Sequence, residues 1–171
     1  MNLEINNGLL LFIFNSLFWI GFSFLIGFIC HLIPFSFYSP KNPIFKERFW
    51  EFGGKLYEFL FFVRLWKDKV PEAGELIKIN PFNKKKLASR ELSYLERFVV
   101  ETSRAELVHI LVLLITPLSY PFNPPIGDYI MTAYGVLANV PCIIIQRYNR
   151  IRLLRLLKKI SRGSAIRRIK S

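Results

Sequence analysis

The chain has 171 residues, a hydrophobic fraction of 52%, and 24 Lys and Arg against 12 Asp and Glu, a formal net charge of +12. Such a charge can indicate a nucleic-acid partner, but no base-stacking or groove-reading element accompanies the basic residues, so we expect no nucleic acid. The two cysteines form neither a CxxC nor a zinc spacing, which argues against redox chemistry and a disulfide framework.

The first predicted element is a membrane span over residues 9–33. This run of 25 residues contains no Asp, Glu, Lys or Arg, and about 20 apolar residues suffice to cross a bilayer core. Glu4 precedes the run and no Lys or Arg does. Because the run is also longer than the apolar core of a signal peptide, we expect a retained transmembrane helix.

Residues 36–100 are predicted to form a cytoplasmic or interfacial segment. Within it, residues 45–66 mix Phe, Trp and Leu with Lys and Arg, a composition typical of a helix in the headgroup plane. A re-entrant or fourth insertion around residues 56–65 is the alternative. Residues 71–81 predict a loop, and apolar residues at helical spacing predict a helix from Leu87 into the next span.

Two further spans are predicted over residues 101–120 and 129–146. The turn-forming residues 123–128 separate them, so the two helices should form a hairpin. Together these elements predict one membrane domain of the all-α class. It would contain three transmembrane helices, an aromatic-rich amphipathic interfacial segment and a basic C-terminal helix.

The basic residues predict the orientation in the cell membrane. Fourteen Lys and Arg lie within residues 41–104, ten follow the third predicted span, and none precedes the first. Because Lys and Arg accumulate on the cytoplasmic side, three spans place the N-terminus outside and the C-terminus in the cytoplasm. The tail, residues 147–171, predicts a basic amphipathic helix at the membrane surface that Gly163 and Ser164 break.

A polar cluster on the second and third predicted spans carries the candidate chemistry. Glu106 and His109 are three residues apart and therefore share a helix face, and Asn139 reaches a similar depth on the third span. Ionisable groups at membrane depth are costly and indicate a functional site. In acyl transfer, His109 would act as general base, Glu106 would orient it, and Asn139 would donate to the oxyanion.

Two other interpretations of this cluster stay open. Polar side chains between membrane helices also form structural hydrogen bonds, and the chain would then be a non-catalytic assembly or lipid-binding partner of biosynthetic enzymes. In addition, Glu106 and His109 match the Glu-x-x-His element of di-iron proteins. Those sites need a second such element, which the sequence lacks, so we expect no metal.

Two groups of basic and aromatic residues are candidates for phosphate binding. The first contains Trp66, Lys67 and Lys69, and the second contains Arg147 and Arg150. Residues of these types commonly anchor a protein at the lipid headgroups. They can also bind the phosphates of an activated acyl donor such as coenzyme A.

Three blocks of the sequence resemble a known family. They are residues 63–69 (VRLWKDK), 101–109 (ETSRAELVH) and 138–153 (ANVPCIIIQRYNRIRL). In this order they resemble the glycosyl-4,4'-diaponeurosporenoate acyltransferase family, small bacterial membrane proteins of staphyloxanthin-type carotenoid synthesis. The resemblance implies transfer of a fatty acyl group from a coenzyme A or acyl carrier protein thioester, without a further cofactor. The acceptor would be a sugar hydroxyl of a glycosylated carotenoid or other glycolipid.

The candidate substrate-binding residues come from these blocks and from the phosphate-binding groups. They are Glu101, Arg104, Trp66, Lys67, Lys69, Gln146, Arg147, Asn149 and Arg150. The expected partners are the membrane, the lipid or glycosylated carotenoid acceptor, and further copies of the chain or other enzymes of a biosynthetic complex.

Overall fold

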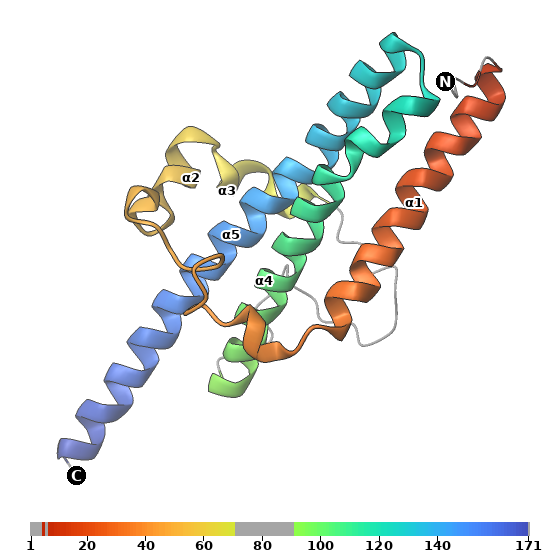
Figure 1. Cartoon of the computed structure of the whole chain (residues 1–171). Helices are drawn as coiled ribbons and strands as arrows, with labels where there is room; N and C mark the ends of the chain where they lie inside the picture. Colours follow the sequence, from red (N-terminus) through yellow and green to blue (C-terminus); the bar gives the residue numbers. More distant parts are fainter. Residues whose placement is uncertain (1–4, 6, 71–90, 171) are drawn as a thin grey trace. The chain divides into compact units, whose positions relative to one another are not determined.

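The computed structural model describes residue 5, residues 7–70 and residues 91–170, with side chains as far as residue 162. All regular structure in these residues is helical, which confirms the all-α prediction (Figure 1). The elements in chain order are α1 (Gly8–Leu32), η1 (Phe35–Tyr38), η2 (Phe49–Gly54), α2 (Lys55–Leu60), α3 (Val63–Trp66), η3 (Lys67–Lys69), α4 (Leu92–Leu114), η5 (Thr116–Phe122) and α5 (Pro125–Lys170).

The chain divides into two compact units. Unit 1 comprises Met1–Pro34 and Arg104–Ile143, and unit 2 comprises Phe35–Ser103 and Ile144–Ser171. The long helices α4 and α5 therefore each contribute one part to unit 1 and one part to unit 2.

Local sequence explains both ends of α1. The side chain of Asn7 accepts hydrogen bonds from the backbone N–H groups of Leu9 and Leu10, at 3.0 and 3.2 Å, and so caps the first turn. At the other end Ile33 is extended, as expected for a residue before a proline. The helix therefore covers almost the whole predicted first span.

By length and composition, two helices of the described residues could cross a membrane, namely α1 and the Pro125–Arg162 part of α5. Only 17% and 22% of their most apolar windows are buried. The predicted span over residues 101–120 is not one of them, so the structure offers two candidate spans instead of three. The reason is that α4 carries five charged residues between Glu96 and Glu106 and ends at Leu114, where the 3-10 helix η5 with its two prolines follows.

The third predicted span and the predicted tail lie in one helix, and the predicted break at Gly163 and Ser164 is wrong. Helix α5 begins with Pro125 in its first turn, which suits a proline. It then continues without interruption through residue 146 and through Gly163 and Ser164 to Lys170. A glycine inside a helix costs about 1 kcal/mol, which the neighbouring helix-forming residues can offset.

The prediction of one continuous helix over residues 45–66 is wrong as well. Four residues have positive φ, which divides this segment into η2, α2 and α3: Phe52 (47°), Gly53 (68°), Gly54 (88°) and Phe62 (46°). Several aromatic side chains are nevertheless exposed, as predicted for an interfacial segment, with Phe49 at 86% and Phe59 at 83%, whereas Phe45 and Tyr57 are buried. The predicted loop at 71–81 and the start of a helix at Leu87 lie outside the described residues.

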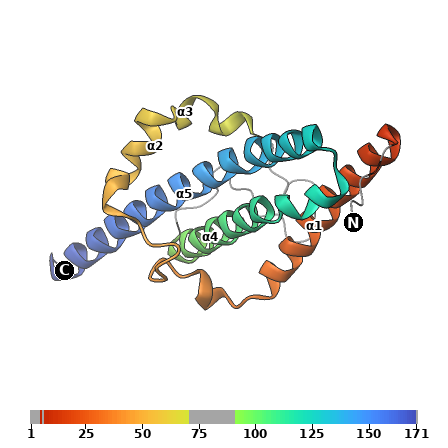
Figure 2. The ribbon, with the colours of Figure 1, turned by 45° about the horizontal axis from the view of Figure 1, so that its top comes forward.

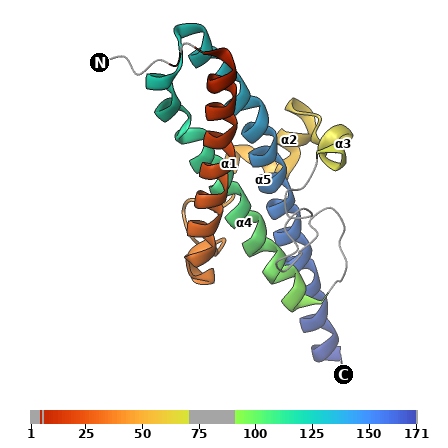
Figure 3. The same cartoon turned by 90° about the vertical axis from the view of Figure 1, so that its right-hand side faces the viewer.

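Unit 1 is held together by an apolar cluster and a pair of amides. The cluster joins α1, α4 and α5 and consists of Phe18, Trp19, Ile26, Cys30, Val112 and Met131. At one end of the unit, Asn15 donates to Asn123 at 2.9 Å, and Asn123 donates back to Asn15 at 3.2 Å. This reciprocal pair ties α1 to the end of η5 (Figure 3).

Unit 2 has two apolar clusters that share α5. In the first, Tyr57 and Val63 of the α2–α3 segment pack on α5 residues, and Figure 2 shows α2 and α3 beside this helix. In the second, Leu95, Phe98 and Val99 of α4 pack on Leu153. The part of α5 from Ile144 to Ile160 is therefore packed in the fold, although the sequence predicts most of it as a basic tail.

Candidate functional site

His109 and Asn139 meet in unit 1. His109 lies on α4 and is half-buried, and Asn139 lies on α5 with 4% of its surface exposed. The His109 Nδ1 atom lies 3.0 Å from Asn139 Oδ1. The Asn139 Nδ2 group donates to the backbone carbonyl of Gly135 at 2.9 Å.

These two contacts determine the tautomer of His109. The carbonyl of Gly135 can only accept, so the Asn139 amide must direct Nδ2 toward it and Oδ1 toward the histidine. Because Oδ1 is an acceptor, Nδ1 of His109 carries the hydrogen and donates it. In the neutral imidazole the lone pair is then on Nε2, which is the atom that a general base uses.

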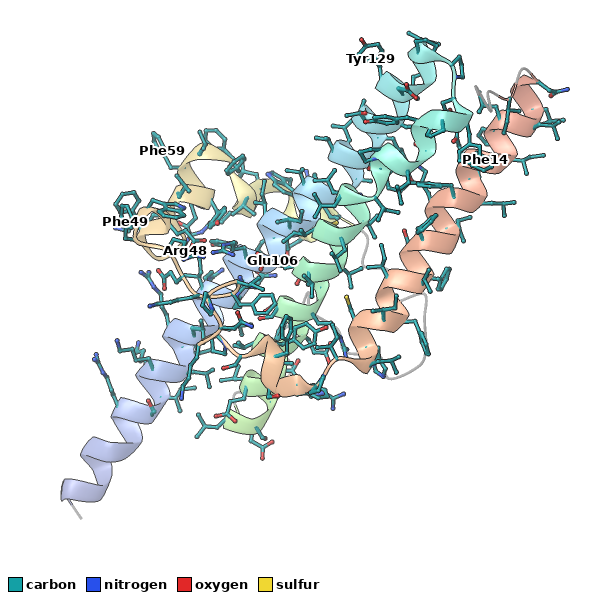
Figure 4. All side chains as sticks on the ribbon, in the orientation of Figure 1. Phe14, Arg48, Phe49, Phe59, Glu106 and Tyr129 are labelled. Atoms are coloured by element: carbon teal, nitrogen blue, oxygen red, sulfur yellow. The ribbon has the colours of Figure 1, made fainter. Side chains whose placement is uncertain are left out.

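The contact of Asn139 with Nδ1 of His109 has the same partners as the His–Asn contact in Cys-His-Asn proteases. The sequence predicts Glu106 as the residue that orients His109. Glu106 is 2% exposed and lies one helical turn before His109 on α4 (Figure 4). Its influence on His109, and the predicted donation of Asn139 to an oxyanion, stay predictions.

Arg104 belongs to the same unit and contacts the end of α1. Its Nη1 group lies 3.1 Å from Nδ1 of His31. Because a guanidinium can only donate, Nδ1 of His31 accepts, and the hydrogen of a neutral His31 lies on Nε2. The two histidines of the chain therefore have opposite tautomers, each determined by its partner.

A polar network of unit 2 that sequence reasoning missed surrounds Glu51. This carboxylate is fully buried and forms a bidentate pair with Arg147, with Nε–Oε1 at 2.7 Å and Nη2–Oε2 at 3.3 Å. Tyr57 donates to Oε1 at 2.6 Å, and the backbone N–H of Arg48 donates to Oε2. The sequence signal that could have found this network is an acidic residue, Glu51, between the aromatic residues Trp50 and Phe52. A carboxylate buried among aromatics needs a charged partner.

The network shifts the pKa values of Glu51 and Tyr57 in opposite directions. Burial raises the pKa of the Glu51 carboxyl, but the hydrogen bonds from Arg147, the Arg48 backbone and Tyr57 outweigh it and hold this pKa below its ordinary value. Burial and the hydrogen bond to Glu51 raise the pKa of the Tyr57 hydroxyl well above its ordinary value. Glu51 is therefore ionised and Tyr57 is neutral at physiological pH.

Two of the predicted phosphate-binding arginines hold the segment before η2 in place. Arg147 donates to the carbonyls of Ile44 and Lys46, at 3.3 and 3.1 Å. Arg150 is 1% exposed, donates to the carbonyl of Phe45 at 3.1 Å and lies 5.6 Å from the centroid of that ring. Both guanidinium groups thus have structural contacts, and their predicted role toward a substrate stays a prediction.

A second network that sequence reasoning missed centres on Tyr148 of α5. Its hydroxyl donates to Glu58 at 2.7 Å and accepts from Arg64 at 3.2 Å and from Arg152 at 3.4 Å. Arg64 also forms an ion pair with Glu58 at 2.8 Å. The hydrogen bond from Tyr148 and the charge of Arg64 lower the pKa of Glu58. The network fastens α2 and α3 to α5.

The remaining predicted residues lie in unit 2 with local contacts. The indole of Trp66 donates to the carbonyl of Phe61 at 2.7 Å, Lys67 pairs with Asp68 at 2.6 Å, and Lys69 is exposed. The other three are Glu101 (buried), Gln146 (buried) and Asn149 (half-buried). The predicted residues thus divide between the units, with the candidate base and its orienting residue in unit 1.

Comparison with known proteins identifies relatives over most of the chain. A sequence model described as glycosyl-4,4'-diaponeurosporenoate acyltransferase matches residues 41–159. Proteins of that name from Staphylococcus aureus strains MRSA252, bovine RF122 / ET3-1 and USA300 are each 34% identical over 149 residues, which cover 87% of this chain and 89% of theirs. No solved structure matches. The chain belongs to the glycosyl-4,4'-diaponeurosporenoate acyltransferase family.

Proposed function

We propose that this acyltransferase moves a fatty acyl group from a thioester donor to a sugar hydroxyl of a glycosylated carotenoid, at a membrane. The names of its relatives support the acceptor and the reaction class. The observation that carries the mechanism is the contact of His109 Nδ1 with Asn139 Oδ1, because in a neutral imidazole it places the lone pair on Nε2, the atom that would accept the proton.

In the proposed reaction the sugar hydroxyl oxygen attacks the thioester carbonyl carbon while Nε2 of His109 accepts the hydroxyl proton. The tetrahedral intermediate collapses, the carbon–sulfur bond breaks, and the imidazolium returns the proton to the departing thiolate. Asn139 keeps the ring in the required tautomer. The buried carboxylate of Glu106, one turn away, would stabilise the transient positive charge on the ring.

Binding of the donor is assigned to cationic residues of the family blocks. Coenzyme A and acyl carrier protein thioesters both carry phosphate groups, which Lys and Arg bind by charge-assisted hydrogen bonds. Arg104, Lys67 and Lys69 are the candidates whose positions suit this role, because Arg104 is half-exposed on α4 and Lys69 is exposed. No cofactor is required by this chemistry.

We propose three membrane crossings, all made by unit 1. Helix α1 and the first part of α5 are two of them. The third would combine Arg104–Leu114 with the 3-10 helix η5, which together extend about 30 Å, the thickness of a bilayer core. The N-terminus would be outside and the C-terminus in the cytoplasm.

Accessibility of single cysteines tests this topology. In a variant without Cys30 and Cys142, a membrane-impermeant maleimide should label Gly8→Cys and Lys159→Cys from opposite sides. Both positions are exposed, and nothing lies near a side chain introduced at Gly8. If both cysteines are labelled from the same side, the chain crosses the membrane an even number of times, and the proposal of three crossings is wrong.

The experiment for the reaction compares lipid products of membranes that contain the protein or its His109→Gln variant. With labelled acyl-coenzyme A and a glycosylated carotenoid, mass spectrometry should show the acylated product only for the intact protein. Loss of a general base lowers the rate about 10²- to 10⁴-fold. The control is Tyr120→Phe, which removes a 2.6 Å hydrogen bond to Thr132 in the same unit. Activity retained in His109→Gln would remove this residue from the mechanism.

The second candidate function is a non-catalytic partner of biosynthetic enzymes. The contact of His109 with Asn139 joins α4 and α5, as structural hydrogen bonds between membrane helices do. Under this interpretation His109→Gln would lower the thermal stability in detergent, and the intact protein would yield no labelled product with either thioester donor.

A further inference from the structure

Unit 2 has a surface hollow that none of the candidate residues above lines. Its volume is about 780 Å³, and its walls are Phe52, Lys55, Leu56 and Phe59 together with Arg155 of α5. Three of these side chains are apolar, two are cationic, and no acidic residue is among them. Such a lining suits a ligand with an apolar part and a negatively charged group.

The place of Arg155 in this hollow depends on a glycine. Gly53 has a φ of +68°, and a Cβ atom there would lie 1.2 Å from Nη2 and 1.8 Å from Cζ of Arg155. A side chain at this position would strain the backbone and displace the flexible end of Arg155. Gly54, with a φ of +88°, differs, because its nearest neighbour would be Tyr148 at an ordinary 3.4 Å. The sequence at Gly53 thus brings the guanidinium against the backbone at the hollow.

The two cations of the hollow are not neutralised within the described part of the chain. Other cations of unit 2 pair with carboxylates, as Arg147 does with Glu51 and Arg64 with Glu58. Neither Lys55 nor Arg155 has an ion pair or a side-chain hydrogen bond among the described residues. Two unpaired cations on apolar walls attract an anion and make its binding favourable.

The surroundings indicate where the anion comes from. Phe49 and Phe59, which project from the ribbon in Figure 4, are 86% and 83% exposed, and Phe52 is 65% exposed. Clustered aromatics at this exposure beside Lys and Arg are typical of surfaces that enter the lipid headgroup region. A phosphate compound without an apolar part would gain nothing from these aromatic side chains, whereas the acyl chains of a bilayer lipid would cover them.

We propose that this hollow binds an anionic bilayer phospholipid. Lys55 and Arg155 contact the phosphate group, and an acyl chain of the lipid lies against Phe52, Leu56 and Phe59. The site is independent of the proposed acyl transfer, since it requires no reaction of the bound lipid. It gives unit 2 a preference for negatively charged membranes that a simple amphipathic surface would not specify.

Native mass spectrometry of the protein in a neutral detergent tests the proposal. Dioctanoyl phosphatidylglycerol should bind in preference to dioctanoyl phosphatidylcholine, and Arg155→Gln or Lys55→Gln should raise its dissociation constant about tenfold. Arg155→Lys should retain part of the affinity because it keeps the charge. The control Lys41→Gln removes one exposed charge from the same unit and should leave the affinity unchanged.

Two glycine variants distinguish an effect of the position of the Arg155 guanidinium from an effect of net charge on lipid binding. Gly53→Ala should displace Arg155 and weaken phosphatidylglycerol binding several-fold. Gly54→Ala also strains the backbone, but its added methyl group does not contact Arg155. Equal binding of both lipids would overturn the proposal, as would equal losses in Lys41→Gln and Arg155→Gln or in the two glycine variants. Binding of coenzyme A in place of the lipid, sensitive to Arg155→Gln, would overturn it in favour of a soluble phosphate ligand.

Discussion

The two units differ in how their buried polar side chains are paired. In unit 1, the contacts Asn15–Asn123 and His109–Asn139 are hydrogen bonds between side chains of different elements, and the carboxyl group of Glu106 is buried in the same unit. In unit 2, the buried carboxylate of Glu51 is paired with the guanidinium of Arg147 and accepts from two further donors, the Tyr57 hydroxyl and the Arg48 backbone N–H. A neutral pair costs little desolvation, whereas a buried charge is tolerated only when its partners are complete.

This difference indicates a division of roles. A neutral, hydrogen-bonded histidine in an apolar unit is suited to accept a proton during a reaction. The ion pair of Glu51 and Arg147 joins η2 to α5, and Arg147 also donates to two backbone carbonyls. Such contacts are suited to stabilise the fold. The candidate general base lies in unit 1, and the buried ion pair of Glu51 and Arg147 lies in unit 2.

The largest effect on stability should come from breaking the charged network. Arg147→Met leaves the fully buried Glu51 without its guanidinium partner, and we expect a loss of about 3 kcal/mol in the free energy of unfolding. Denaturant unfolding in detergent measures it. The double variant with Glu51→Gln removes the orphaned charge and should recover much of the loss. If the double variant is as unstable as Arg147→Met, the loss of stability does not come from the unpaired charge of Glu51.

The next largest effect concerns the neutral contact at the candidate base. Asn139→Leu leaves Nδ1 of His109 without its acceptor, and we expect kcat to fall about 10-fold or more, because the ring loses its fixed tautomer. KM should stay nearly constant. Asn15→Leu breaks the other neutral pair of unit 1 and should lower stability by about 1 kcal/mol with kcat unchanged. Equal kcat losses in both variants would make Asn139 merely structural.

A smaller effect is expected from pH. The pKa of Glu51 in the folded protein is below its ordinary value of 4.5, so its ionisation contributes stability above pH 4.5 that is lost as the pH falls through the folded pKa. Glu51→Gln should flatten the loss of stability in acid. Glu58→Gln is the control, because that carboxylate is more exposed and should contribute less. Thermal unfolding as a function of pH measures both.

The smallest effect should come from a buried hydroxyl of unit 1. Thr116 is 3% exposed, and its Oγ1 has no hydrogen-bond partner among the described residues. Thr116→Val replaces the hydroxyl by a methyl group of similar size. We expect stability to change by less than about 1 kcal/mol, in the stabilising direction, because no hydrogen bond is lost. Destabilisation by more than this in thermal unfolding would reveal a polar partner of Thr116.

Part of the fold and part of the candidate site follow from the sequence. Charge-free composition determines α1, and helical spacing places His109 and Asn139 at similar depths, where the structure brings them into contact. The three family blocks identify the family that the comparisons show. These features depend on local composition or on periodicity within one helix, so no knowledge of distant contacts is needed.

Other features depended on tertiary structure. The sequence does not reveal that Glu51 would reach Arg147, 96 residues away, or that the break at Gly163 would be overridden by the continuation of α5. It does not give the tautomer of His109, because that depends on which atom of Asn139 the Gly135 carbonyl engages. Composition determines which segments avoid water, whereas the pairing of buried polar atoms depends on the atomic distances that only packing establishes.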